Sequence, residues 1–69
     1  MSRIIKITLR SARINAGLNQ KQAAHLLKIG VSTLQGYESG SRIPRWDMVL
    51  RIQKVYSISH ENLIFGKAS

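Results

Sequence analysis

The apolar positions of the chain recur every three to four residues in short stretches, which is the spacing of amphipathic helices. The first stretch contains Leu9, Ala12 and Ala16 and stops at Gly17, a residue that favours the C-terminal end of a helix. The pattern therefore predicts a first helix over about residues 6 to 16.

Polar residues and glycines mark the limits of the next two helices. Asn19 is followed three residues later by Gln22, which is typical of a capping box at a helix start. A second helix is predicted from there to near Lys28. A third helix is predicted over Val31–Ser39, and Gly40 is expected to close it.

The fourth segment is apolar over a wide arc. Pro44 is suited to the first position of a helix, where its missing N–H has no partner to lose. The predicted inner face consists of Trp46, Val49, Leu50 and Tyr56. The apolar residues of a second side are Met48, Ile52 and Val55, and the remaining polar residues are Asp47, Arg51 and Lys54. This arc exceeds what one surface helix needs, so part of it is expected to contact a fifth helix or another subunit.

The two ends of the chain are less regular. The isoleucines at positions 4, 5 and 7 are compatible with an extended arm as well as with the start of the first helix. Ser59 is a suitable cap for a last short helix, after which residues 63–65 pack back or outward. From Gly66 onward the chain is interpreted as a frayed tail.

Composition adds a strong positive charge to this picture. Eleven Lys and Arg residues against three Asp and Glu give a formal net charge of +8 and a sequence pI of about 11.0. Such a charge points to a polyanionic partner, with nucleic acid first. A ribosomal or merely soluble basic domain and a membrane-surface helix are the alternatives that charge alone leaves open.

Several functions are disfavoured by what the sequence lacks. It has no cysteine, and His25 and His60 beside three acidic residues offer no spacing for a metal site, so no metal, disulfide or cofactor is expected. Both histidines are interpreted as ordinary surface residues, and no catalytic site or small-molecule ligand is expected. No signal peptide and no run of about 18 apolar residues is present, so a cytoplasmic protein without a membrane partner is expected.

A chain of 69 residues is one domain at most. The predicted fold is therefore all-α: a single domain over residues 1–69, built as a compact bundle of about five short helices.

At this point the spacing of several residues resembles a known family. The residues that carry the resemblance are Gly17, Leu18, Asn19, Gln20, Ala24, Ile29, Leu34, Glu38, Ser39, Gly40 and Pro44. They resemble, over about residues 9 to 64, the helix-turn-helix family of phage repressors, Cro proteins and their bacterial Xre relatives. The resemblance implies a lambda repressor-like DNA-binding domain.

The resemblance also implies roles for structural residues. Ala24 would lie where the second and third helices cross, and Arg13 and Glu38 would meet as a largely buried ion pair between the first helix and the end of the third. Two residues depart from the family pattern. Lys28 occupies a turn position that usually carries glycine, and Gln53 replaces a small apolar residue and needs a partner or a path to solvent.

Four residues of the third helix are implied to face DNA bases: Val31, Ser32, Gln35 and Gly36. An amide such as Gln35 suits adenine, and Val31 suits a thymine methyl group. The interpretation of Gly36 stays open between a close approach of the backbone to DNA, close packing against another helix, and a neutral position without a special role.

Contacts to phosphate or in the minor groove are implied for Gln20, Lys21, Lys28, Ser39, Arg42 and Arg45. With few base-reading side chains in one copy, a homodimer on a palindromic double-stranded DNA operator is expected. Its candidate interface consists of Met48, Ile52, Val55, Ile58, Leu63, Ile64 and Phe65. That surface could equally close the core of the monomer.

The expected function is that of a Cro-like or repressor-type transcriptional regulator. Full-length repressors of this family often carry a further C-terminal domain, so the Cro-like form is the expectation unless the sequence is a fragment. The alternatives on the same fold are an antitoxin, a restriction-modification controller or a protein-interaction module.

Overall fold

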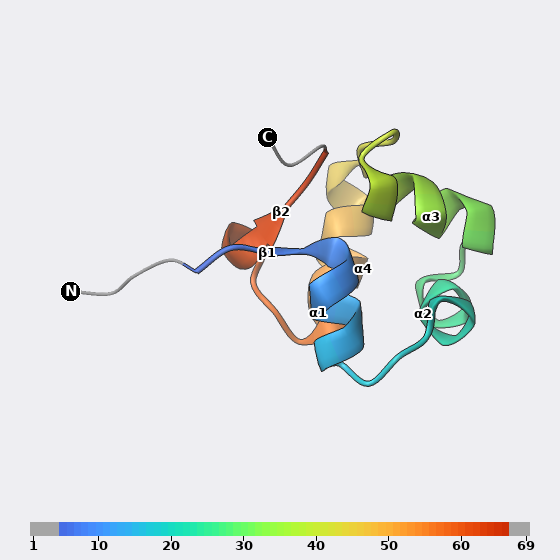
Figure 1. Cartoon of the computed structure of the whole chain (residues 1–69), viewed down its shortest axis with the longest axis horizontal. Coiled ribbons are helices and arrows are strands. Elements are labelled where there is room, and N and C mark those ends of the chain that lie inside the picture. The colour runs from blue at the N-terminus through green and yellow to red at the C-terminus, as the bar shows by residue number, and fades with distance from the viewer. Residues whose placement is uncertain (1–4, 67–69) are drawn as a thin grey trace.

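The structure is a computed structural model and describes residues 5–66. The helices are α1 (Leu9–Asn15), α2 (Gln20–Leu27), α3 (Val31–Ser39) and α4 (Trp46–Tyr56), followed by a 3-10 turn (His60–Asn62). Two short strands, β1 (Ile7–Thr8) and β2 (Leu63–Ile64), lie beside the helices near the chain ends (Figure 1). The expected compact, mostly helical fold is confirmed, with four α-helices where about five were predicted. The possible arm at residue 4 lies outside the described residues.

The core is formed where the four helices meet. Its largest fully buried side chains are Leu27, Leu34 and Ile52, which come from α2, α3 and α4. Ala23 and Ala24 are 0% and 2% exposed, and their small side chains let α3 and α4 approach α2 closely. The helix-turn-helix pair is thus fixed against α4, which leaves the outer side of α3 to solvent.

The first and last parts of the described segment are joined by a pair of strands that the sequence did not predict. β1 and β2 are parallel, with Ile7 opposite Leu63 and Thr8 opposite Ile64. Thr8 also caps α1, since its Oγ1 accepts a hydrogen bond from the Ser11 N–H at 3.1 Å. The first helix therefore begins at Leu9 and not at residue 6, because the two residues before it pair with β2.

The last predicted helix is also corrected. Ser59 does cap a helical turn, with its hydroxyl accepting from the Glu61 N–H at 3.4 Å, but the turn is 3-10 and only three residues long. Leu63 then enters β2 and is 4% exposed. The helix stops there because backbone pairing with β1 takes the place of helical hydrogen bonds.

Helix α4 differs from the prediction in where it begins and in which side of it is buried. The helix begins at Trp46 with Arg45 as its N-cap, so Pro44 lies buried before the helix instead of in its first turn. Trp46 and Leu50, expected inside, are 57% and 43% exposed. The buried side is Met48, Val49, Ile52 and Tyr56, because that side faces α1 and α2. An apolar arc this wide does not reveal from sequence which part meets the core.

Two turns use non-glycine residues in the left-handed region. Lys28, after α2, has φ 60°, and Ser57, after α4, has φ 53°. Lys28 therefore keeps the left-handed turn of the family despite its side chain, at a cost of about 1 kcal/mol. Within residues 5–66, no helix is long and apolar enough to cross a membrane.

The phenol of Tyr56 generates a prediction about alkaline stability. Burial raises its pKa from 10.0 to about 12, with a further rise from the Glu38 charge and an opposing effect of Arg13. Its hydroxyl has no hydrogen-bond partner among the described residues. Because the folded state holds this proton more tightly than the unfolded state, its contribution to stability is complete below pH 10 and is lost as the pH rises toward 12.

We therefore expect Tyr56→Phe to reduce the loss of stability between pH 9 and pH 11, and to change stability at pH 7 by less than about 1 kcal/mol. Urea unfolding of the parent and the variant at each pH measures both effects. An equal loss of stability in the two proteins on going to pH 11 would contradict the assignment.

Candidate nucleic-acid interface

The start of α2 presents backbone amides to solvent. The predicted capping box is present: Asn19 Oδ1 accepts from the Gln22 N–H at 2.8 Å, and Gln22 Oε1 accepts from the Asn19 N–H at 2.9 Å. Within the first turn, this leaves the N–H groups of Gln20 and Lys21 without helical acceptors. Together with the helix dipole they make this end of α2 favourable for an anion.

Helix α3 is held by one side and open on the other. Leu34 is 1% exposed, whereas Tyr37 and Val31 are half-buried and pack against the core. Ser32 and Gln35 are exposed. Of the four residues implied to face DNA, Val31 is thus partly engaged with the protein core, and the polar side chains of Ser32 and Gln35 are exposed to solvent.

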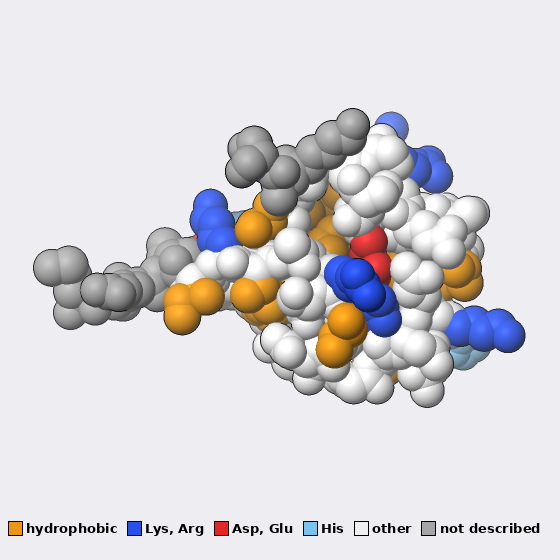
Figure 2. Space-filling model, in the orientation of Figure 1, with side chains coloured by type: hydrophobic (Ala, Val, Ile, Leu, Met, Phe, Trp, Pro, Cys, Tyr) orange, Lys and Arg blue, Asp and Glu red, His pale blue; other side chains and the backbone are white. Residues whose placement is uncertain are grey.

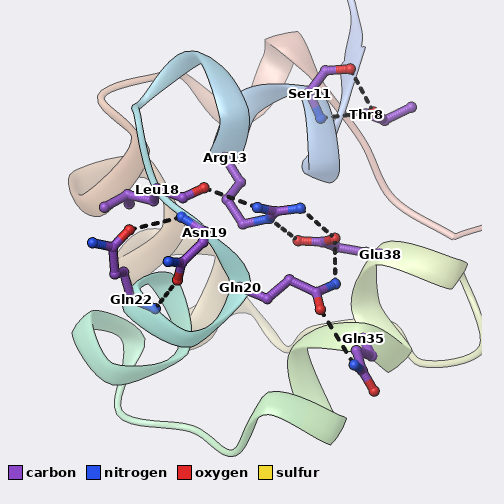
Figure 3. Close-up of polar contacts among 9 residues, drawn as sticks. All are labelled: Thr8, Ser11, Arg13, Leu18, Asn19, Gln20, Gln22, Gln35 and Glu38. Atoms are coloured by element: carbon purple, nitrogen blue, oxygen red, sulfur yellow. Dashed lines mark hydrogen bonds and ion pairs between the residues drawn. The ribbon is translucent and has the colours of Figure 1, made fainter.

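A buried ion pair ties α1 to the end of α3 (Figure 3). Arg13 Nε donates to Glu38 Oε2 at 2.7 Å, and the side chains of the two residues are 9% and 6% exposed. A second guanidinium nitrogen of Arg13 donates to the Leu18 carbonyl at 2.9 Å. The pair implied by the resemblance therefore also fixes the segment that leads into α2.

The same carboxylate is connected to the outer surface of the domain. Gln20 Nε2 donates to Glu38 Oε1 at 3.1 Å, and Gln35 Nε2 donates to Gln20 Oε1 at 3.3 Å (Figure 3). A continuous hydrogen-bonded row thus leads from Arg13 to Gln35. The sequence did not indicate this link, because nothing in the spacing of the two glutamines states that they meet.

The residues predicted to supply cationic contacts all lie on the surface. The side chains of Lys21, Lys28, Arg42 and Arg45 are exposed. In Figure 2 the surface over α2 and α3 is mostly uncharged and polar, with Lys and Arg side chains at its margins. Ser39 is exposed as well, but its hydroxyl donates to the Gly36 carbonyl at 3.1 Å, so it also stabilises the end of α3.

Gly36 is covered by another part of the chain. A Cβ at this position would lie 2.7 Å from Arg42 Cδ and 2.9 Å from Arg42 Cγ. The structure thus places close packing within the protein at Gly36, although the partner is a loop side chain and not another helix.

One further expectation is met and another is corrected at the end of α4. Gln53, which needed a partner, accepts from the His60 N–H at 2.6 Å and lies 2.7 Å from His60 Nδ1. His60 is half-buried and stacks edge-on against Trp46, with ring centroids 5.0 Å apart. It is therefore a structural residue and not an ordinary surface histidine, while His25 is exposed as expected.

The expected dimer interface is corrected in part. Met48, Ile52 and Leu63 are 7%, 1% and 4% exposed and belong to the core of the monomer. The other four residues are half-buried: Val55, Ile58, Ile64 and Phe65. The more exposed apolar side chains on this part of the chain are Ile43, Trp46 and Leu50, at 62%, 57% and 43%.

Two helices joined by a tight left-handed turn, the second anchored by Leu34 and open on its outer side, define a helix-turn-helix domain. The chain belongs to the helix-turn-helix domain family, whose sequence model matches residues 7–63. This membership confirms the resemblance to the helix-turn-helix family.

The curated relatives agree with this assignment. The chain is 39% identical over 56 residues to the HTH-type transcriptional regulator ImmR of Bacillus subtilis, covering 81% of this chain and 44% of that protein. It is 29% identical over 56 residues to the cryptic phage CTXphi transcriptional repressor RstR of Vibrio cholerae, covering 81% and 50%. The chain thus spans about half the length of these relatives. No solved structure matches it.

The ion pair gives a prediction about stability. Arg13→Met is expected to lower the free energy of unfolding by about 3 to 5 kcal/mol, because it leaves the Glu38 carboxylate buried without a cation. Glu38→Gln, which leaves the guanidinium unpaired, is expected to act in the same direction. The matched control is the double variant Arg13→Met with Glu38→Leu, which recovers most of the loss since neither charge remains. Denaturant unfolding of Arg13→Met with the midpoint of the parent would contradict this role.

Proposed function

We propose that the chain binds double-stranded DNA sequence-specifically and acts as a Cro-like or repressor-type transcriptional regulator at a palindromic operator. The observation that carries the proposal is the hydrogen-bonded row from buried Arg13 to exposed Gln35. A solvent-exposed polar side chain loses conformational freedom when it is held in this way. That arrangement suits a residue that must present fixed donors and acceptors to a partner.

Gln35 retains the groups that adenine requires. Its amide has two N–H donors and one carbonyl oxygen, and the structure uses one donor, toward Gln20. The second donor is free for adenine N7 and the oxygen for the adenine N6 amino group. Ser32, exposed one turn earlier, lies on the same side of α3 and is a second candidate base contact.

Phosphate contacts would position α3 in the groove. The free amides at the start of α2 and the second Nε2 hydrogen of Gln20 suit one phosphate, with Lys21 beside them. Two further exposed cations are Lys28, in the turn before α3, and Arg45, the N-cap of α4. The net charge of +8 favours rapid and salt-dependent association with a polyanion.

We further propose that the chain binds the operator as a dimer, and that the two copies contact each other through the exposed side of α4. Trp46 and Leu50 leave a large apolar area on this helix. Asp47, Leu50 and Lys54 are all exposed and lie in one row along it, because residues three and seven apart share a helix face. In an antiparallel pair of α4 helices around a two-fold axis near Leu50, Asp47 of each copy faces Lys54 of the other. The row is therefore complementary to itself.

Selection of bound duplexes from a random pool tests the function. We expect inverted half-sites about 10 bp apart and a steep fall of affinity with salt. Gln35→Ala is expected to weaken binding by about 1 to 3 kcal/mol and to relax the preference at one A·T pair in each half-site. Gln20→Ala should weaken DNA binding less in the Gln35→Ala variant than in the parent, since Gln20 acts partly by holding Gln35.

A parent protein that enriches no sequence and binds duplex DNA only weakly at low salt would reject the DNA-binding function. That outcome would favour a protein-interaction module on the same fold.

The dimer is tested by exchanging the charges of the row. Asp47→Lys or Lys54→Asp alone places like charges opposite each other twice in the dimer, so each is expected to weaken association roughly tenfold. The double variant restores opposite charges and should recover the affinity of the parent. Sedimentation with and without operator DNA measures this. A parent that stays monomeric at high concentration in both conditions would contradict the dimer.

A further inference from the structure

Gly36 lies on the outward side of α3. It follows the buried Leu34 by two residues, which places it about 200° around the helix from that anchor. It also directly follows Gln35, the exposed residue that the proposed function assigns to base contact. A side chain at position 36 would therefore project outward, on the side of α3 that the proposed function places in the major groove of DNA. Glycine has no side chain to fill this place.

The stem of Arg42 occupies this place. A Cβ built on Gly36 would lie 2.7 Å from Cδ, 2.9 Å from Cγ and 3.4 Å from Cβ of Arg42. Three successive carbons of the arginine thus run across the glycine. The side chain that is missing from α3 is replaced by one from the loop that follows it.

The loop backbone fixes this arrangement. Gly40 adopts φ 84° and turns the chain back, so the Arg42 N–H donates to the Gly36 carbonyl at 3.1 Å. The hydroxyls of Ser39 and Ser41 donate to the same carbonyl at 3.1 and 3.4 Å. The base of the Arg42 side chain is therefore tied to the residue that the stem covers.

The guanidinium group of Arg42 is available for a ligand. Arg42 is exposed, and the hydrogen bonds and ion pairs found among residues 5–66 do not use its side-chain nitrogens. By contrast, Arg13 is held by Glu38 and Leu18, and Arg51 Nη1 donates to the Leu27 carbonyl at 3.4 Å. The stem of Arg42 is held against α3 by its packing on Gly36, while its guanidinium group makes no hydrogen bond or ion pair among residues 5–66.

We propose that Arg42 reads a guanine in the major groove, next to the base pair contacted by Gln35, and that Gly36 is the positioning residue that directs it there. The proposal rests on the proposed DNA-binding function. It moves Arg42 from the phosphate or minor-groove contacts expected from sequence to a base-specifying contact. The fork of the guanidinium matches guanine O6 and N7, which only the major groove presents together.

Gly36→Ala separates this role from stability. The added methyl group overlaps a flexible, exposed side chain, so Arg42 must leave α3 while the helix itself is kept. Alanine is also a better helix former than glycine, so the variant should be at least as stable as the parent. A change in DNA recognition by Gly36→Ala would then reflect the direction of Arg42 and not unfolding.

The test is duplex selection and salt titration with the parent, Arg42→Ala, Gly36→Ala and the double variant, with Arg45→Ala as the matched control. The parent is expected to prefer G·C at one position per half-site by about 5- to 150-fold. Arg42→Ala and Gly36→Ala should each lose this preference at the same position, and the double variant should lose no more. Arg45→Ala should weaken binding on every sequence and lower the salt slope by about 0.9 per copy.

The outcomes distinguish this proposal from the one on which it rests. If the parent selects an operator but Arg42→Ala weakens all sequences equally and lowers the salt slope like Arg45→Ala, Arg42 is a phosphate contact and the proposal is wrong. If Gly36→Ala still changes binding in the Arg42→Ala background, Gly36 acts by close approach to DNA and not through Arg42. If the parent selects no sequence, the DNA-binding function itself fails.

Discussion

The buried ion pair between Arg13 and Glu38 is the contact on which the rest of the domain depends. It joins α1 to the end of α3, holds the segment before α2 through the Leu18 carbonyl and orients Gln20 through its second carboxylate oxygen. A buried pair of this kind adds little net stability, because desolvation opposes the attraction between the charges. Its value is geometric: it sets the place of α3 relative to α2. The proposed fit of α3 into a DNA groove depends on that relation.

The parallel pairing of β1 with β2 stabilises a domain that is small. A domain of this size buries only about 60% of the surface that its unfolded chain exposes, so each additional contact matters to its stability. Pairing residue 7 with residue 63 closes the chain on itself, and the Asn62 side chain adds a hydrogen bond from Nδ2 to the Ile5 carbonyl at 2.9 Å. Leu63 then completes the core beside α1. The core is thereby completed without using the residues on the outer side of α3.

Local signals in the sequence predicted the parts of the fold that local chemistry determines. The capping box at Asn19 and the glycine after Ser39 placed α2 and α3 correctly, because caps act within a few residues. The strands were missed because two residues carry no periodic pattern and their pairing spans the whole chain. The predicted buried side of α4 was partly wrong because the apolar residues nearly encircle the helix, so only tertiary contacts decide which of them are buried.

The candidate site shows the same division between local and long-range information. Helical periodicity predicts which positions of α3 point outward. The hydrogen bonds that hold Gln35 in place, however, join Gln20 to Gln35, 15 positions away, and to Glu38, 18 positions away. The stem of Arg42 over Gly36 is shorter in range, yet it depends on how the loop turns at Gly40. A glycine within a helix gives no indication of which neighbour fills the space beside it. The surface proposed to contact DNA is therefore formed by α3 and the loop that follows it, and the α3 sequence alone describes only part of that surface.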